Sequence, residues 1–281
     1  MKIKIFTCYY RASPIIKSDI VEPIQVGKAI AKENLGIAGD NEGDNISTKN
    51  PYYSELTATY WIWKNVKADA VGLFHYRRFF NFKTLDTKCR KIAPSFFENY
   101  DITEENIAKL LSKYDIILPN KTETGKESLY EYYQRKHVIS DMDYTLGAIE
   151  KKYPDMAKIA EKVVKHNSQM YCANMLIASK KLFDEYAHWL FDVLFEVEGH
   201  IQRDVLGRDP YQRRAYGFLA ERMMAVFIEY KKQTSDIKIK EVPILFLEDK
   251  IGKWCAYLIR RFRRKFLTAI GLEKGHWKKG W

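Results

Sequence analysis

The pattern of apolar and polar positions along the chain predicts a strand at its start and a buried strand near residue 70. Residues 2–10 alternate apolar and polar side chains, which is typical of a strand. The run at 70–74 is continuously apolar and predicts a buried strand. Between them, residues 52–65 carry apolar side chains at helical spacing, and we expect a helix there.

Further predicted elements alternate between helix and strand. They are a helix over 103–114, a strand at 114–120, helices between 127 and 166, a strand at 170–180, and two long amphipathic helices at 181–201 and 216–232. Strands that alternate with helices favour an α/β fold with a mostly parallel or mixed sheet.

Composition narrows the class of protein. The chain has 281 residues, of which 46% are hydrophobic and 14% aromatic, so it can bury a large core and is not disordered. Its four cysteines are far apart in the sequence and form no C-x-x-C pair, which predicts neither a zinc site nor a disulfide framework. We find no signal peptide and no apolar run of 18 residues, and we expect a cytoplasmic protein.

The composition shifts after Pro243, and we divide the chain into a domain at 1–248 and a basic tail at 249–281. From Trp254 to Ile270 every fourth residue is apolar, with arginines and lysines between them. Such a basic amphipathic helix can bind an anionic membrane surface, which predicts a peripheral protein on the inner face of the cell membrane. The alternative is a helix packed on the protein's own core.

The net charge of +11 and the pI near 9.2 imply an anionic partner. Nucleic acid, a membrane surface and a phosphorylated substrate all satisfy this requirement. The basic residues are concentrated in the tail and in one cluster after 70–74, and no nucleic-acid-binding motif is recognised. A nucleic-acid-binding protein is therefore the alternative hypothesis, and we expect no nucleic-acid partner.

The cluster consists of His75, Tyr76, Arg77 and Arg78, which directly follow the predicted strand at 70–74. Ligands of open α/β sheets bind beyond the carboxyl ends of strands. Two guanidinium groups and an imidazole can hold a pyrophosphate by charge-assisted hydrogen bonds. A surface cluster of salt bridges is the alternative.

Several stretches, in the same order, give the chain a resemblance to one family. They are "TCYY", "NPYYSELTATYWIWKN", "GLFHYRRFF", "DIILP", "YCANMLIASKKLFDEY" and "GFLAERM". Together they resemble the bacterial capsule and exopolysaccharide glycosyltransferases long catalogued as a domain of unknown function, some of which are linked to galactofuranose transfer. The resemblance covers about residues 2–245, HYRR is its most specific part, and the basic tail lies outside it.

This resemblance implies a glycosyltransferase A-like, Rossmann-like mixed sheet flanked by helices. It implies transfer of a sugar from a nucleotide donor, expected to be UDP-linked, to a lipid-linked oligosaccharide. In most such folds a D-x-D motif holds a divalent cation at the position that HYRR occupies here. The resemblance therefore implies that His75, Arg77 and Arg78 bind the diphosphate. We expect no cofactor, although the sequence leaves a divalent cation open.

The end of the first strand is the expected nucleotide site. Thr7, Tyr9, Tyr10 and Arg11 would lie where the base and ribose bind, since a base can stack on a tyrosine. Core packing of the tyrosines is the alternative.

Inverting sugar transfer requires a base that takes the proton of the acceptor hydroxyl. Glu221 interrupts an apolar helical segment and is the expected base, and a structural pair with Arg222 is the alternative. A literal D-x-D at Asp141 and Asp143 opens a predicted helix. We expect it to cap that helix, with a catalytic or acceptor contact and metal binding as alternatives.

His137, Asn174 and Arg222 are the candidate acceptor-binding residues. An amide such as that of Asn174 offers a sugar hydroxyl both a donor and an acceptor. Alternatively, Asn174 satisfies buried backbone groups and His137 is simply packed.

Overall fold

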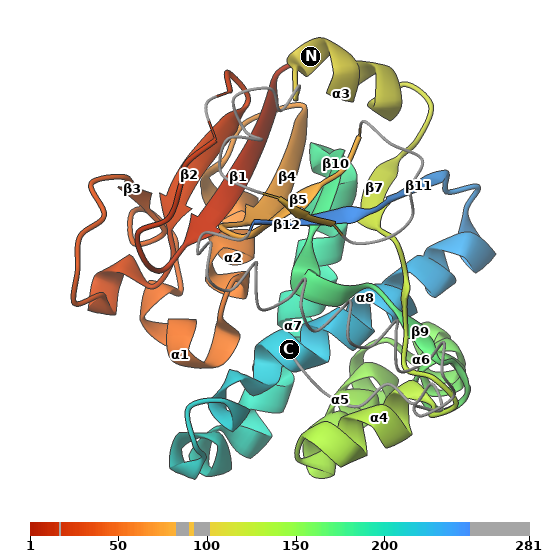
Figure 1. Ribbon diagram of the computed structural model, residues 1–281. Helices are drawn as coiled ribbons and strands as arrows, with labels where there is room; N and C mark the ends of the chain where they lie inside the picture. The colour runs from red at the N-terminus through yellow and green to blue at the C-terminus, as the bar shows by residue number, and fades with distance from the viewer. Residues whose placement is uncertain (17, 83–89, 93–101, 248–281) are drawn as a thin grey trace, which may run out of the picture.

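A computed structural model describes residues 1–16, 18–82, 90–92 and 102–247 (Figure 1). The strands are β1 (Ile3–Tyr9), β2 (Val21–Gln25), β3 (Ala38–Gly39), β4 (Ala70–His75), β5 (Arg78–Phe80), β6 (Arg90–Ile92), β7 (Ile116–Pro119), β8 (Thr122–Glu123), β9 (Gln169–Met170), β10 (Leu176–Ser179), β11 (Ile239–Val242) and β12 (Ile244–Leu247). The α-helices are α1 (Asn50–Tyr53), α2 (Leu56–Asn65), α3 (Glu104–Leu111), α4 (Leu129–Lys136), α5 (Ile139–Lys152), α6 (Pro154–His166), α7 (Lys180–Gly207) and α8 (Ala215–Thr234). The tail predicted at 249–281 lies outside the described residues.

The central sheet has the strand order β11-β7-β10-β4-β1-β2-β3. Strand β1 is parallel to β2 on one side and to β4 on the other, whereas β10 is antiparallel to both β4 and β7. This arrangement confirms the predicted mixed α/β sheet. The chain moves outward in opposite directions from β1, so a topological switch point lies between β1 and β4. Their carboxyl ends adjoin, with Cys8 opposite His75.

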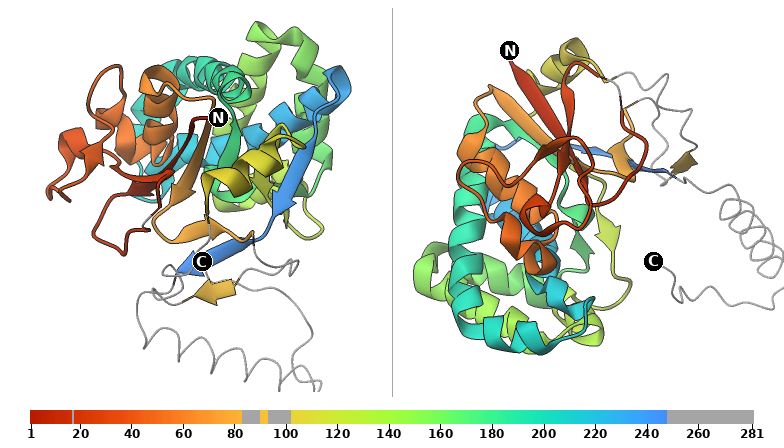
Figure 2. Two further views of the ribbon diagram at one scale, coloured as in Figure 1. Left: turned by 90° about the horizontal axis from the view of Figure 1, so that it is seen from above. Right: turned by 90° about the vertical axis from the view of Figure 1, so that its left-hand side faces the viewer.

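Alternating side chains of the strands pack into two different cores. Phe6 of β1 and Leu73 of β4 belong to the core that includes buried residues of α2, α7 and α8. Ile5 and Phe74, which point the other way, belong to the core that contains residues of α3 and β12. Figure 2 shows α7 and β12 on opposite sides of β4. The sheet is therefore covered on both faces, and the carboxyl-end loops remain to form a site.

Two predicted elements are broken in the structure. The helix expected over 52–65 is interrupted at Ser54, which has φ 51° and ψ −129° and separates α1 from α2. The strand expected at 170–180 is interrupted by a single helical turn, η4 (Cys172–Asn174), in which Ala173 and Asn174 have φ of 74° and 48°. In the described part of the chain these three are the non-glycine residues with positive φ.

The shift in composition after Pro243 does not end the folded core. Residues 244–247 form β12, which is antiparallel to β5 and parallel to β6. Leu245 and Leu247 are buried in the core on that side of the sheet. Cys8 and Cys172 are both free thiols. Within the described ranges, no helix has the length and apolar character needed to cross a membrane.

Candidate active site at the carboxyl ends of β1 and β4

The antiparallel strand β10 brings a distant segment over the end of β4. Because Leu176 at the start of β10 pairs with Leu73, the turn η4 just before it lies above His75. There the Asn174 side chain donates a hydrogen bond of 2.7 Å from Nδ2 to Oε1 of Glu55. Asn174 is 4% exposed and also donates to the Gly217 carbonyl of α8 at 3.1 Å. We call the group formed by Glu55, His75, Ala173, Asn174 and Glu221 the strand-end site.

Glu55 is a residue that the sequence reasoning did not single out. It precedes α2, directly after the backbone irregularity at Ser54. Burial by itself raises the pKa of the Glu55 carboxyl, but the His75 ring and the hydrogen bond from Asn174 outweigh it. The net pKa of Glu55 is lowered, so this carboxylate is ionised at neutral pH.

His75 is partly buried at the end of β4. Burial lowers the pKa of its imidazole to about 4, with Glu55 acting in the opposite direction and Arg78 adding to the lowering. The ring is therefore neutral at pH 7. Its Nε2 atom is buried and has no hydrogen-bond partner among the described residues.

Glu221, the expected base, uses both of its carboxylate oxygens. Oε1 accepts the backbone N–H of Ala173 at 2.7 Å, and Oε2 accepts Nη1 of Arg222 at 3.1 Å. Arg222 is 2% exposed and also donates to the Phe218 carbonyl at 2.8 Å. The Glu221–Arg222 pair expected as the alternative is thus present. Burial raises the pKa of Glu221.

The two arginines of HYRR have different surroundings. Arg77 Nε donates to the Leu247 carbonyl at 3.2 Å, and the Arg77 carbonyl accepts the Leu247 N–H at 3.0 Å, which attaches β12 to the end of β4. The Arg78 guanidinium lies 5.8 Å from the Phe246 ring centroid, and its charge acts on both His75 and Glu221.

A further cation, Arg214, was missed because nothing in its sequence neighbourhood marks it. It lies just before α8, and its Nε donates to the Ser54 hydroxyl at 3.0 Å. Its positive charge also acts on Glu55 and His75. Arg78 and Arg214 therefore give the strand-end site two positive charges from different segments of the chain.

The expected nucleotide-binding residues divide into exposed and buried pairs. Tyr10 and Arg11 are exposed beyond β1, and the Tyr10 hydroxyl lies 3.2 Å from that of Tyr76. The two rings meet edge to face at 5.1 Å, with the Arg11 guanidinium 5.6 and 5.2 Å from their centroids. Thr7 and Tyr9 are buried instead, so the exposed aromatic surface comes from Tyr10 and Tyr76.

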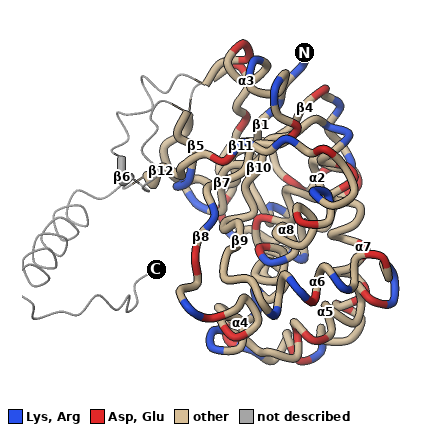
Figure 3. Tube along the Cα trace, turned by 90° about the vertical axis from the view of Figure 1, so that its right-hand side faces the viewer, with Lys and Arg blue, Asp and Glu red and all other residues tan. Residues whose placement is uncertain are grey.

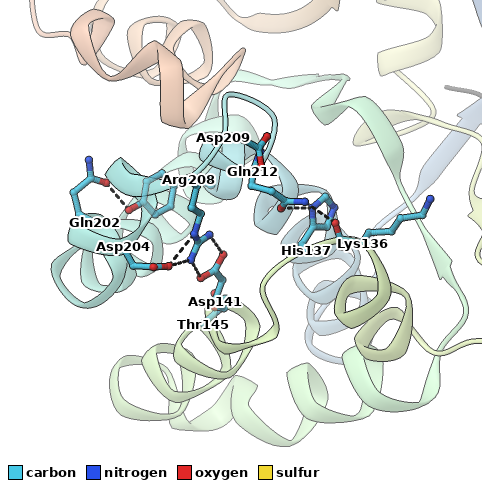
Figure 4. A network of polar contacts seen from close by, with 10 residues as sticks. Lys136, His137, Asp141, Thr145, Gln202, Asp204, Arg208, Asp209 and Gln212 are labelled. Carbon is cyan, nitrogen blue, oxygen red and sulfur yellow. Dashed lines mark hydrogen bonds and ion pairs between the residues drawn. The ribbon is translucent and has the colours of Figure 1, made fainter.

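Asp141 lies in a different polar network, drawn in Figure 4, and Asp143 makes a separate contact. Helix α5 begins after Val138, which makes no capping hydrogen bond, so neither aspartate caps the helix as expected. Asp141 does lie in the first turn, where a negative charge interacts favourably with the helix dipole. The Asp141 carboxylate, 0% exposed, binds the guanidinium of Arg208, the residue after α7, through two hydrogen bonds of 2.6 and 2.7 Å. Asp143 accepts a hydrogen bond of 2.8 Å from the Tyr130 hydroxyl.

His137 lies beside this network and packs on aromatic rings. Its Nδ1 is 3.2 Å from Oε1 of Gln212, and its ring stacks on Phe218 with centroids 4.1 Å apart. Burial lowers the pKa of His137 to about 4, and Arg222 adds to the lowering. These contacts agree with the alternative that His137 is simply packed against its neighbours.

The contacts described above give the site no metal ligands. Across the described residues, no group of three or more His, Cys, Asp or Glu side chains is arranged to hold a metal ion.

Comparisons with known proteins agree with this architecture. One solved structure, of the WbbM bifunctional glycosyltransferase in its apo form, matches with a TM-score of 0.82 and 32% sequence identity. The match covers 89% of this chain and 46% of that chain, so this chain spans about half of its length. No protein with a curated description matches significantly. Residues 4–233 match the family described as Domain of unknown function (DUF4422), and the chain therefore belongs to that family.

Proposed function

We propose that this protein is a glycosyltransferase that moves a hexose from a nucleotide donor to a glycan acceptor. The observation that carries the proposal is the strand-end site at the topological switch point, inside the part of the chain that is similar to a bifunctional glycosyltransferase. The site combines a carboxylate, a neutral imidazole and nearby arginines, which suits a reaction in which an anionic diphosphate leaves.

The proposed donor is a UDP-linked sugar. Arg78 and Arg214 would contact the diphosphate, together with His75 as the sequence predicted, while Arg77 holds β12. Fixed cations stabilise the negative charge that grows on the leaving diphosphate, and on this basis we propose that transfer does not depend on a divalent metal. The exposed Tyr10 and Tyr76 rings, with Arg11, offer the base a stacking surface.

The proposed acceptor is a lipid-linked oligosaccharide in capsule, O-antigen or exopolysaccharide synthesis, and galactofuranose is the candidate sugar. Asn174 Oδ1 has no hydrogen-bond partner among the described residues and is the proposed acceptor for a sugar hydroxyl. Because this atom is buried, the hydroxyl reaches it only if the turn at Ala173 and Asn174 moves. Attachment to an anionic membrane through 249–281 rests on the sequence pattern, since these residues lie outside the described ranges. The proposed reaction is a single displacement that inverts the anomeric carbon.

A thermal-shift screen with UDP, UDP-sugars and other nucleotide sugars tests the donor, beside filter binding with RNA and DNA. In Figure 3, Lys and Arg alternate with Asp and Glu along α4 to α8, which does not favour a nucleic-acid surface there. We expect a UDP-sugar to raise Tm and to be turned over in excess EDTA. Complete loss of turnover in EDTA with recovery in manganese would contradict metal independence, and RNA or DNA binding without any nucleotide-sugar effect would contradict the proposed activity.

A further inference from the structure

Two carboxylates from different helices bracket the left-handed turn at Ala173 and Asn174. Glu221 of α8 binds the backbone N–H of Ala173, and Glu55 before α2 binds the side chain of Asn174. The turn lies over the end of β4, where the donor and acceptor would meet in the proposed reaction. The two carboxylates therefore differ in the groups that they bind and in whether an oxygen atom is left without a side-chain partner.

Both carboxylate oxygens of Glu221 already accept hydrogen bonds from the protein, which leaves little room for a substrate contact. Its Oε1 is bound to the main chain of the turn and its Oε2 to the buried guanidinium of Arg222. Glu55 accepts one side-chain hydrogen bond, at Oε1, and its carboxylate also interacts with the N–H of its own backbone. Its Oε2 has no side-chain partner in the described part of the chain. Both carboxylates are partly buried, so exposure does not separate them. An acid that is to accept a substrate proton needs such an uncommitted oxygen.

Backbone strain is concentrated around Glu55. Ser54, which precedes Glu55, and Asn174, which binds it, both have positive φ, as does Ala173 next to Asn174. Such conformations are rare for residues other than glycine and persist where the surrounding structure enforces them, often at active sites. Arg214 holds Ser54 from the other side through the hydroxyl. The strained segments on both sides therefore fix the position of one side chain, Glu55.

We propose that Glu55 is the general base of the transfer reaction and that Glu221 is a positioning residue that holds the turn carrying Asn174. This inference rests on the proposed function. As the acceptor oxygen bonds to the anomeric carbon, its proton passes to Oε2 of Glu55. The bond from the anomeric carbon to the diphosphate oxygen breaks, and its electron pair leaves with the nucleoside diphosphate. Glu55 then returns the proton to solvent.

The surroundings of Glu55 suit this role. The positive charge of Arg214 and the Asn174 hydrogen bond favour the ionised carboxylate, so it is ready to accept a proton at neutral pH. In the Glu55→Gln variant the amide can still bind near Asn174 but cannot take the proton. We therefore expect kcat to fall roughly 100-fold or more, with the Kd for UDP changed less than about twofold.

The test compares Glu55→Gln, Glu221→Gln and the control Glu22→Gln, in which an exposed carboxylate on β2 that pairs with Lys4 is replaced. Each full-length variant is assayed for UDP affinity, Tm, and kcat and KM as functions of pH. In the wild type we expect kcat to fall at low pH as Glu55 is protonated, and we call this fall the acid limb of the profile. It should disappear only in Glu55→Gln. Glu221→Gln should lower Tm and raise the acceptor KM while it keeps the limb, and Glu22→Gln should match the wild type.

Chemical rescue provides a readout that a purely structural role would not change. We expect formate or azide to restore part of the rate of Glu55→Ala and none of the rate of Glu221→Ala. If Glu55→Gln does not fold, Glu55→Asp replaces it and should lower kcat while retaining the acid limb. An acid limb that survives in Glu55→Gln, or disappears in Glu221→Gln, would overturn the inference. A wild type that binds no nucleotide sugar would overturn the proposed function instead.

Discussion

The strand-end site and the network around Asp141 both bury charged groups, but they differ in how fully these groups are paired. In the network, Asp141 faces Arg208 in a two-fold hydrogen bond, Arg208 also binds Asp204, and Thr145 binds the Asp141 carbonyl. In the strand-end site, His75 Nε2 and Asn174 Oδ1 are buried without a partner in the described residues.

This difference teaches which signal marks a functional site in this fold. Buried polar groups are normally hydrogen-bonded, so groups that are left unpaired require an explanation, such as a ligand that completes them. Unpaired buried atoms also occur at Tyr133, beside the network, and at Tyr186 and Trp189 in the core. The strand-end site differs because its two unpaired atoms lie beside left-handed backbone at Ala173 and Asn174. Burial and charge alone would have pointed to both places.

The largest effect on stability is expected from a substitution that breaks the network around Asp141. Asp141→Ala leaves the Arg208 guanidinium, whose side chain is 8% exposed, without its main partner. We expect the free energy of unfolding to fall by about 3 kcal/mol, because the buried guanidinium then keeps only the exposed Asp204 as an ionic partner. Urea denaturation measures this, and UDP affinity of the folded fraction should be unchanged. A loss below about 1 kcal/mol would contradict the structural role.

The next effect concerns donor binding at the strand-end site. Arg78→Ala and Arg214→Ala should each weaken UDP binding by about 2 kcal/mol, since each removes charge-assisted contacts to the diphosphate. Calorimetry measures Kd, with Arg203→Ala on the exposed face of α7 as the control. Arg77→Ala should mainly lower Tm, because Arg77 holds β12. Unchanged Kd values in both variants would remove the diphosphate assignment.

Each of the two regions contains a histidine that should make the stability of the fold depend on pH. His75 and His137 have pKa values lowered to about 4, below the value near 6.5 of an unfolded histidine. Their neutral forms stabilise the fold above pH 6.5, and this contribution is lost as pH falls from 6.5 toward 4. Each contributes a slope of up to about 1.4 kcal/mol per pH unit. Tm measured from pH 7 to 4 should fall less steeply in His137→Gln.

The smallest effect tests the remaining acid of the D-x-D stretch. Asp143 makes an exposed hydrogen bond to Tyr130, so Asp143→Asn should change stability by about 0.5 kcal/mol or less. We also expect its transfer rate to equal that of the wild type. A rate comparable to that of Glu55→Gln would instead place Asp143 in the reaction.

The sequence by itself determined the strands that carry the site. The alternation over β1 requires one covered face, and the continuous apolar run of β4 requires two. The polar residues that follow each strand then lie at the sheet edge. Tyr10 and Arg78 were found in this way. The Asp141 assignment failed because local helix signals do not reveal a partner such as Arg208, which lies 67 residues away.

Only the tertiary structure decided which acid joins His75. Glu55 and Asn174 are 119 residues apart, and they meet because β10 runs antiparallel to β4 and because Ser54 and Ala173 adopt backbone conformations that are rare for serine and alanine. Hydrophobic periodicity predicts continuous elements, so it did not predict the break at Ser54 or the one at Ala173. The contacts between helices α2 and α8 and the turn before β10 stabilise these conformations, and such contacts form only when distant segments pack together.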